Sequence, residues 1–446
     1  MWPPSHNHRR YRYIMKYTHT VLLFIIIFMG CVHFKSYFNL FYNAKRDYEE
    51  AIKTEPPSTQ KLDKVIERCG KIIKYYPTSR WVPDAVLLMG KAFLAKGEYS
   101  QAEEKFREFI KFFPEHKACN EARYMLAETY IKQGDLIKAR ELLEPLISTN
   151  KGQFCERAYY LLIQSYFEEH AYYEAIDKGE QFLKRFPKSS YKGDVLLTLG
   201  AAYDSLHEYE HAATMYQQAL QFATRKNPIL IKLARAEILM GNVEEGLNRL
   251  EELRKRVTEP TEEEAIALEM ARGYIELGDT NRAIDLLQKY TNSVNALVLL
   301  AEIHEWLCNY KEAAQYYDEI TKKGDPLLRA RASLRKEAID KLLKYEADTS
   351  MTDTSIFRLA ELYLFEFDQL DKARQYYLKV WQDYPQSRYA PKAGLALAWI
   401  ARHKDDNPEL ACKYYAAVIE RYPNTYYARK ANELLNAVRE GRGNKE

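Results

Sequence analysis

One stretch of the sequence has the residue types and spacing of a zinc site that hydrolyses peptides. His207 and His211 are separated by three residues, and Glu208 directly follows the first histidine. On a continuous helix this spacing brings both imidazoles to one face, where they hold zinc while the glutamate activates a metal-bound water. The repeat pattern of the chain, however, places a turn between two helices at His207. We therefore predict a protein that is not an enzyme and that binds neither metal nor cofactor, with a zinc hydrolase kept as an alternative.

The cysteines do not form a second reactive or metal-binding motif. Beyond Cys31 the chain has five of them without a C-x-x-C pair, at Cys69, Cys119, Cys155, Cys308 and Cys412. Because this number is odd, at least one thiol stays unpaired within a monomer. Cys69 occupies the position where other repeats carry Phe106 or Tyr216, so we expect it to pack in the core.

The elements that would position any site follow from a short phrase that recurs along the chain. It reads GEYSQA over Gly97–Ala102 and GDLIKA over Gly134–Ala139. Each copy closes on a small residue, at Ala102, Ala139, Ala175, Ala212, Gly246, Ala283, Ala313, Ala373 and Ala411. Successive closing positions lie 37, 36, 37, 34, 37, 30, 60 and 38 residues apart. A period of this length is typical of stacked helical hairpins, none of which can bury its apolar face alone.

Within each copy, the spacing of small and aromatic residues predicts how two helices pack. A small residue or Ile stands twelve residues before the closing position, and an aromatic ring follows three residues later, as in Gly90 with Phe93. The small residue lets two helices approach, and the ring fills the remaining gap. The turn position suits a left-handed backbone, which Gly adopts freely and His tolerates. The residues at this position are Gly97, Gly134, His170, His207, Gly241 and Gly278.

Several second helices are expected to end in an aromatic-Pro pair. These pairs are Tyr76-Pro77, Phe113-Pro114, Phe186-Pro187, Tyr384-Pro385 and Tyr422-Pro423. A hydroxyl residue that can cap the next helix follows four of the prolines by two positions, at Ser79, Ser189, Ser387 and Thr425. Gly and Pro together number only 33 of 446 residues, which is consistent with long helices and short loops.

This combination of signals resembles tetratricopeptide repeats. The resemblance implies an all-α superhelix, or α-solenoid, of about nine to ten helical hairpins. We predict a repeat solenoid over residues 61–345 and C-terminal repeats over 354–440, with a possible joint where the pattern decays between them. Residues 31–53 would form an N-terminal anchor or capping helix.

In tetratricopeptide proteins the first helices line a concave groove, which implies a partner-binding surface in this chain. The residues expected to project there are Leu87, Lys91, Leu94, Tyr124, Glu128, Ile131, Tyr160, Gln164 and Phe167. A groove that is aromatic and apolar, with scattered polar groups, suits an extended or helical peptide from another protein. The alternative is that some rings, Tyr124 and Tyr160 especially, only pack between repeats.

The N-terminus predicts export and attachment to a membrane. Four basic residues precede the uncharged run Val21–Gly30, which is too short to span a bilayer and suits a secretory signal peptide over residues 1–30. The sequence ending at Cys31 partly resembles a bacterial lipobox, which implies lipid attachment at this cysteine. By the same resemblance, Val32 favours the outer membrane. The alternatives are a short uncleaved anchor in the inner membrane and a true start at Met15.

The charge balance argues against nucleic acid as a partner. The first 30 residues hold four of the 66 basic residues and no acidic ones, so the remainder has 62 basic against 63 acidic residues. A protein that binds the phosphate backbone needs a clustered excess of Lys and Arg.

The lipobox, the helical hairpins and the aromatic-Pro junctions together resemble the BamD-like lipoproteins, best over Lys61–Pro187. That family implies a lipid-anchored periplasmic scaffold of the outer-membrane β-barrel assembly machinery, with protein or peptide partners and no catalysis. The family members have about five repeats, so this chain is longer. The alternative is a scaffold anchored in the inner membrane that coordinates peptidoglycan synthesis or secretion.

Overall fold

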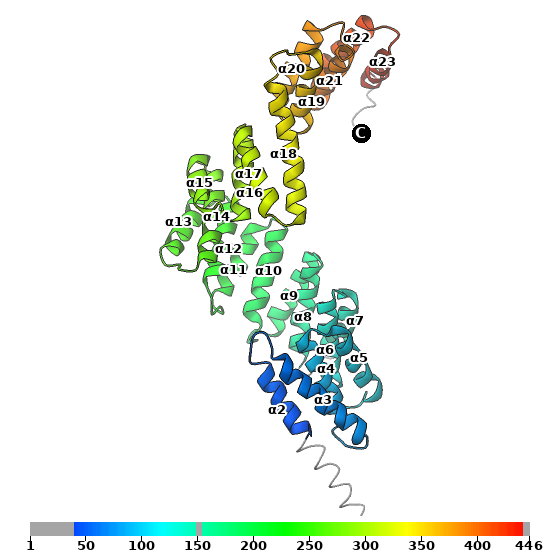
Figure 1. Ribbon diagram of the computed structural model, residues 1–446, viewed down its shortest axis with the longest axis vertical. Coiled ribbons are helices and arrows are strands. Elements are labelled where there is room, and N and C mark those ends of the chain that lie inside the picture. The colour runs from blue at the N-terminus through cyan, green and yellow to red at the C-terminus, as the bar shows by residue number, and fades with distance from the viewer. Residues whose placement is uncertain (1–39, 149–153, 440–446) are drawn as a thin grey trace, which may run out of the picture. The chain divides into compact units, whose positions relative to one another are not determined.

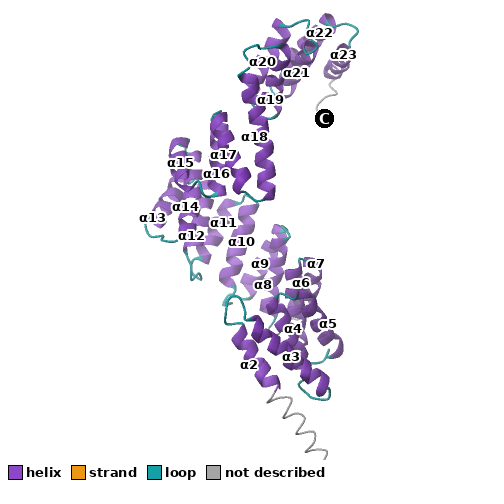
Figure 2. Ribbon diagram, in the orientation of Figure 1, coloured by secondary structure: helices purple, strands orange, loops and turns teal. Residues whose placement is uncertain are grey.

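The computed structural model describes residues 40–148 and 154–439, in which helices are joined by short loops and no strand occurs (Figures 1 and 2). The all-α fold predicted from the repeats is confirmed for this part of the chain. None of its helices combines the length and the apolar character that crossing a membrane requires. The predicted signal peptide over 1–30 and the lipid site at Cys31 lie outside the described residues.

The helices follow one another along the chain in Figure 1. They are α2 (Tyr42–Ala51), α3 (Thr59–Tyr75), α4 (Val82–Lys96), α5 (Tyr99–Phe112), α6 (Cys119–Gln133), α7 (Leu136–Ser148), α8 (Cys155–Glu168), α9 (Tyr172–Arg185), α10 (Lys192–Ser205), α11 (Tyr209–Ala219), α12 (Asn227–Leu239), α13 (Val243–Arg254), α14 (Pro260–Glu276), α15 (Thr280–Leu287), the short 3₁₀ helix η2 (Gln288–Tyr290), α16 (Val294–Trp306), α17 (Tyr310–Lys323), α18 (Pro326–Glu346), α19 (Asp353–Phe365), α20 (Leu370–Asp383), α21 (Ala390–His403), α22 (Pro408–Arg421) and α23 (Tyr426–Arg439).

The chain divides into two compact units, one ending at Lys255 and the other beginning at Arg256. In the first unit, α2 and α3 precede the hairpins α4/α5, α6/α7, α8/α9, α10/α11 and α12/α13. In the second unit, α14/α15 and α16/α17 are followed by the single long α18, by α19/α20 and α21/α22, and by α23. Every predicted closing residue falls in the second helix of one of these hairpins. The predicted joint between residues 345 and 354 falls at the loop between α18 and α19, inside the second unit, and the domain limits stay predictions.

Small residues bring the two helices of a hairpin together, as the sequence predicts. Gly90 of α4 faces the ring of Phe106 in α5, and a Cβ atom on this glycine would lie 2.7 Å from Cε1 of the ring. Gly200 of α10 faces Tyr216 of α11 in the same way. Real Cβ atoms do not approach a ring this closely, so the hairpin spacing depends on the absence of a side chain at these two positions.

A bulky side chain one turn after most closing residues fills the core. Tyr216, Tyr377 and Tyr415 stand four residues after Ala212, Ala373 and Ala411, and each of the three rings is 1% exposed. Closing alanines are themselves fully buried, so the second helix presents a small side chain and then a large one to its neighbour. The buried side chains form several hydrophobic clusters along each unit.

The turns between paired helices have the predicted left-handed backbone. All six predicted positions have positive φ, from 61° at His170 and His207 to 91° at Gly241. Each histidine in this conformation forms a hydrogen bond with the tyrosine two residues later. Nδ1 of His207 lies 2.7 Å from the Tyr209 hydroxyl, and Nδ1 of His170 lies 2.8 Å from the Tyr172 hydroxyl. Cys308, with φ of 59°, takes the same position between α16 and α17.

The hydroxyl residues after the aromatic-Pro pairs bind backbone amides. The serines, however, bind the amide of the residue just before the helix and not an amide in its first turn, as capping would require. Ser189 Oγ accepts from the amide of Tyr191 at 3.0 Å, and Ser387 Oγ accepts from the amide of Tyr389 at 3.0 Å. These amides belong to the residues just before α10 and α21, so the serines close the preceding turn and do not cap the helix interior. Thr425 Oγ1 accepts from the amide of Ala428 at 3.1 Å, which is the predicted capping geometry.

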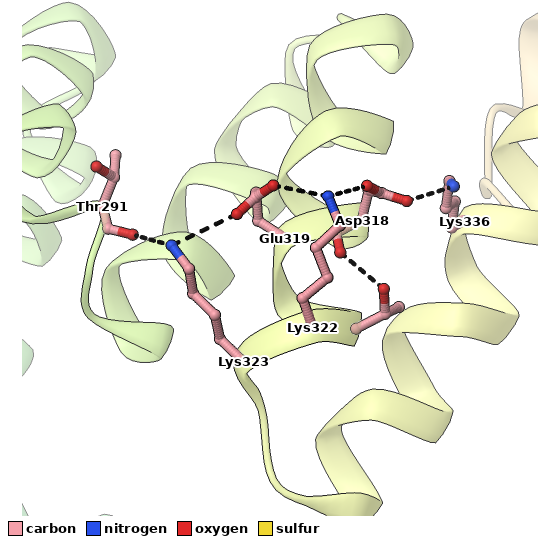
Figure 3. A network of polar contacts seen from close by, with 7 residues as sticks. Thr291, Asp318, Glu319, Lys322, Lys323 and Lys336 are labelled. Carbon is pink, nitrogen blue, oxygen red and sulfur yellow. Dashed lines mark hydrogen bonds and ion pairs between the residues drawn. The ribbon is translucent and has the colours of Figure 1, made fainter.

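A network of charged side chains ties α17 to α18 and to the loop before α16 (Figure 3). Asp318 accepts hydrogen bonds from Lys322 on its own helix and from Lys336 of α18, each at 2.7 Å. Lys323 donates to the backbone oxygen of Thr291 at 3.2 Å and pairs with Glu319 at 3.4 Å. The hydrogen bonds from the two lysines lower the pKa of Asp318 to about 2.

Candidate functional site

The residues that match the zinc pattern do not share a helix. His207 is in the left-handed turn after α10, whereas His211 lies in the first turn of α11. His211 has other partners, with Nδ1 3.4 Å from Glu208 and its ring stacked on Tyr203 at 5.1 Å between centroids. Among the described residues, no group of His, Cys, Asp or Glu is arranged to hold a metal ion. The prediction that this motif straddles a turn is therefore confirmed.

Cys69 is a core residue of α3. Its side chain is fully buried against Leu62, Val65 and Ile72. Burial raises the pKa of the Cys69 thiol to about 12. A thiol that is both inaccessible and protonated at neutral pH is a poor nucleophile, so packing is the role that its surroundings support.

The predicted groove residues lie on the first helices α4, α6 and α8 of the first unit. On α4, Leu87 is buried and Leu94 is half-buried, while Lys91 forms an ion pair with Glu121 of α6. Both charged side chains of this pair are more than three-quarters buried. The pair joins successive first helices and stands on the surface that we expected to receive a partner.

Two predicted groove rings contact the next repeat. Tyr124 of α6 packs on Phe154 with centroids 5.8 Å apart, and Tyr160 of α8 stacks on Tyr191 at 5.0 Å. Gln164 donates a hydrogen bond to Thr198 Oγ1 of α10 at 2.6 Å. These contacts are packing between repeats, which the sequence left open as the alternative to partner binding. Tyr124 and Tyr160 nevertheless remain half-buried, so their faces are not fully covered by the neighbouring repeat.

The other predicted groove positions are also half-buried: Glu128 and Ile131 on α6, and Phe167 on α8. Burial raises the pKa of Glu128, opposed by the charges of Lys132 and Arg157. Phe167 packs against Tyr172 of the following helix with centroids 5.6 Å apart. The contribution of Glu128, Ile131 and Phe167 to partner binding stays a prediction.

A cavity of about 550 Å³ opens at the N-terminal end of this row of first helices. Two predicted groove residues, Leu87 and Lys91, line it. The remaining lining residues were not singled out from the sequence and are Phe41, Lys45, Tyr48, Glu49, Trp81, Asp84, Leu88, Lys117, Ala118, Glu121 and Phe154. Helix α2 therefore supplies one wall, and the residues that immediately precede α4, α6 and α8 supply much of the rest.

The cavity combines aromatic surface with buried polar groups. Phe41 stacks on Trp81 with centroids 5.2 Å apart and planes 21° apart. Burial raises the pKa of the Tyr48 hydroxyl, and the nearby carboxylates of Glu128 and Glu121 raise it further. A site of this size with apolar walls and a few placed polar groups has the character of a ligand-binding pocket. It can hold a side chain, but the residues that line it do not form a catalytic constellation.

Comparison with known families agrees with this architecture. Residues 354–387 and 392–425 each match the model of a tetratricopeptide repeat. These two segments are tetratricopeptide repeats. Residues 45–227 match the family model described as outer membrane lipoprotein (YfiO). This segment runs from within α2 to the beginning of α12, so it contains all nine predicted groove residues and every cavity residue except Phe41. No curated protein matches the chain in sequence.

Solved structures of repeat proteins resemble parts of the chain. A tetratricopeptide repeat protein from Parabacteroides merdae is 19% identical, with a TM-score of 0.46, and the match covers 59% of this chain and 97% of that one. The pilF protein of Pseudomonas aeruginosa is 15% identical, with a TM-score of 0.39, over 49% of this chain and 97% of that one. A putative kinesin light chain from Podospora anserina with nearly identical repeats is 22% identical, with a TM-score of 0.34, over 39% and 94%.

Proposed function

We propose that the protein is a non-catalytic, lipid-anchored scaffold of the cell envelope that binds segments of partner proteins in the groove of its first unit, in the assembly of outer-membrane proteins. The observation that carries this proposal is the match of residues 45–227 to the outer membrane lipoprotein family, because that segment contains the groove and almost the whole cavity. Tetratricopeptide repeats imply protein–protein interaction, and scaffolds of the matched families are generally non-catalytic.

The groove has the properties that a peptide-binding surface needs. Half-buried rings such as Tyr124 and Tyr160 offer apolar area, and the Lys91–Glu121 pair offers charged donors and acceptors beside it. Such a mixture lets apolar side chains of a segment dock while its backbone finds hydrogen-bonding partners. Because the helices that carry these residues are held by packing on both sides, the surface is preorganised for binding.

The proposed anchor would keep this groove close to a membrane. Cys31 precedes Tyr42, the first residue of α2, by eleven positions. Even a fully extended tether of this length spans at most about 40 Å. Two or more acyl chains on Cys31 would hold the protein stably, since one chain gives only marginal membrane binding. The cavity beside α2 would then lie at the membrane-proximal end of the first unit.

A second candidate is a scaffold anchored in the inner membrane that coordinates another envelope process, such as peptidoglycan synthesis or secretion. The observation that favours it is the size of the chain beyond the matched segment. Residues 228–446 lie outside the outer membrane lipoprotein match, and they include the whole second unit. An additional unit offers surface for partners that the shorter family members would not bind.

Two experiments test the proposal. In the first, Cys31→Ser is compared with the wild-type chain by membrane fractionation and by mass spectrometry of the mature N-terminus. We expect the variant to lose processing and membrane attachment, and stable retention in the membrane would contradict lipid anchoring.

In the second experiment, the detergent-solubilised protein is used for affinity capture. Recovery of a large β-barrel protein with its assembly partners supports the proposed function, and their absence with recovery of inner-membrane partners supports the second candidate.

A further inference from the structure

An aromatic residue recurs just before the first helix of a hairpin and stacks on a ring that precedes it in the chain. Tyr191 stacks on Tyr160 at 5.0 Å, with planes 22° apart, and Tyr389 stacks on Phe357 at 4.8 Å, also with planes 22° apart. Trp81 stacks on Phe41 at 5.2 Å, and Phe154 packs on Tyr124 at 5.8 Å. We call each such pair a ring station. The stations join successive repeats on the side of the first helices.

Among the hairpins that follow an aromatic-Pro pair, one lacks the ring before its first helix; the residues before α12, α14, α16 and α19 also lack a ring, but they follow no such pair. Ala118 immediately precedes α6, and the residue that corresponds to Tyr124 and Tyr160 one repeat earlier is Leu87. Both aromatic members of the station between α4 and α6 are therefore missing. The sequence shows the same exception, because the residue four positions after the junction proline is aromatic at Trp81, Tyr191, Tyr389 and Tyr427 but Ala at 118.

The backbone at this position is the same as at the complete stations. Ala118 has φ of −90° and ψ of 9°, and Tyr191 has φ of −83° and ψ of −2°. The amide of Ala118 donates to Nδ1 of His116 at 3.3 Å, in the place where the amide of Tyr191 donates to Ser189. Residue 118 therefore has the backbone conformation that carries an aromatic ring at the complete stations, but its own side chain is a methyl group.

The cavity occupies this incomplete station. Leu87 and Ala118 line it, and it is flanked by the rings of Trp81 and Phe154 from the two complete stations on either side. Its volume of about 550 Å³ is ample for one aromatic side chain with part of the segment that carries it. The space that a ring pair fills elsewhere in the chain is open here.

The charges around the cavity balance, which favours a neutral occupant. Its lining includes three lysines and three acidic residues. Lys91 is already paired with Glu121, and Lys45 lies 3.9 Å from Glu49. Because the lining carries no net charge, a charged side chain entering the cavity would lose water without a net counter-charge to attract it. An aromatic ring would instead stack on the half-buried rings that line the cavity, and the polar rim would bind the backbone of its segment.

We propose that this cavity binds an aromatic side chain carried by a segment of a partner protein, which completes the missing ring station between α4 and α6. The inference rests on the proposed function, since it assigns the chemistry of the residue that a partner places in the groove.

The test uses the full chain in detergent and defined probes of one side chain each. Binding of N-acetyl-tryptophanamide, N-acetyl-tyrosinamide and N-acetyl-leucinamide is measured by saturation-transfer NMR. We expect the aromatic probes to bind at least about threefold more tightly than the leucine probe, because each aromatic contact contributes beyond its buried area. Ala118→Tyr, which supplies the missing ring from within, should abolish this preference while the variant keeps the wild-type unfolding temperature or exceeds it.

The matched control is Lys226→Tyr, which places the same residue at the equivalent exposed position before α12, away from the cavity. It should bind the probes as the wild-type chain does. If Ala118→Tyr does not fold, Leu87→Phe fills the cavity from its other wall and should have the same effect. Equal affinity for all three probes, or unchanged binding by the folded filled variants, would overturn the proposal.

The same variants distinguish a partner segment from other occupants of the cavity. They also distinguish failure of the aromatic pocket from failure of the proposed scaffold function. If sedimentation shows a wild-type dimer that Ala118→Tyr converts to a monomer, the occupant is a second copy and the partner proposal is wrong. If deletion of residues 32–38 greatly strengthens probe binding, the chain's own Phe34, Tyr37 or Phe38 fills the cavity, which also contradicts it. If affinity capture recovers the envelope partners equally with wild type and Ala118→Tyr, the scaffold function stands and the aromatic pocket fails.

Discussion

A Cβ atom on Gly200 would lie 2.5 Å from Cε1 of the Tyr216 ring. The two residues face each other across the α10/α11 hairpin, and the ring is 1% exposed. Gly200→Ala must therefore displace a fully packed tyrosine. We expect it to lower the free energy of unfolding by about 1–3 kcal/mol, the usual range for overpacking. Urea denaturation followed by circular dichroism measures this loss.

Gly70 is the matched control for this substitution. It lies in the interior of α3, and nothing is within 4 Å of a Cβ atom placed on it. Gly70→Ala should stabilise the chain by up to about 1 kcal/mol, because Ala is the better helix former. Equal effects of the two substitutions would show that the contact with Tyr216 does not set the spacing of the α10/α11 hairpin.

The ring station of Tyr160 and Tyr191 should contribute to the coupling between successive repeats. Their stacked rings are worth about 0.5–1.5 kcal/mol beyond the area that they bury. Tyr160→Leu, Tyr191→Leu and the double variant form a cycle in which both single changes keep an apolar side chain. We expect a coupling energy in that range from denaturation of all four proteins. Strict additivity of the single effects would mean that the stacking itself contributes nothing.

Acid should remove the contribution of the Asp318 network. The hydrogen bonds from Lys322 and Lys336 hold the pKa of Asp318 at about 2, below its ordinary value of 3.8. A carboxyl whose pKa is lower in the folded state stabilises the fold when ionised. Its contribution is therefore complete above about pH 4 and is lost as the pH falls through 2.

The measurement for this network is the unfolding temperature of the wild-type chain and of Asp318→Asn between pH 7 and pH 2. The difference between the two should be constant down to about pH 4 and shrink below it. Because these side chains are at least partly exposed, the difference should also decrease at high salt. A difference that grows towards low pH would contradict the assigned direction of the pKa shift.

Cys69 should resist alkylation in the native protein. With a pKa of about 12, its thiolate fraction at pH 8 is about one in ten thousand, and the side chain is fully buried. Iodoacetamide should modify the partly exposed Cys412 first, as followed by peptide mass spectrometry. In guanidinium chloride, Cys69 and Cys412 should react at similar rates. Early modification of Cys69 in buffer would show that α3 opens readily.

The repeat architecture could be predicted because each of its signals is local. A glycine such as Gly97 at a turn, or Ala102 four residues before Phe106, has the same meaning in most repeats and depends little on distant residues. The sequence missed the left-handed turn at Cys308, since cysteine has no particular preference for positive φ. Here the surrounding helices impose the conformation on a residue that does not favour it.

The cavity could not be predicted in the same way. It depends on Tyr48 of α2 and on Phe41 just before that helix, which reach the first helices through tertiary packing that no repeat pattern records. Ala118 was the one available signal, since it breaks an otherwise aromatic series, but a single small residue has meaning only once the stacking partners are known. Likewise, the contact of Gln164 with Thr198 depends on how adjacent repeats are staggered.

The small-residue contacts act within one hairpin, and the ring stations join a hairpin only to its immediate neighbour. A chain built on such rules can lengthen by duplication of one hairpin without redesign of the others. The 219 residues that follow the matched segment (446 minus 227) are consistent with growth of this kind. New units gained in this manner would start as copies free to diverge, so evolution could add binding specificities at the C-terminal end while the ancestral groove stayed unchanged.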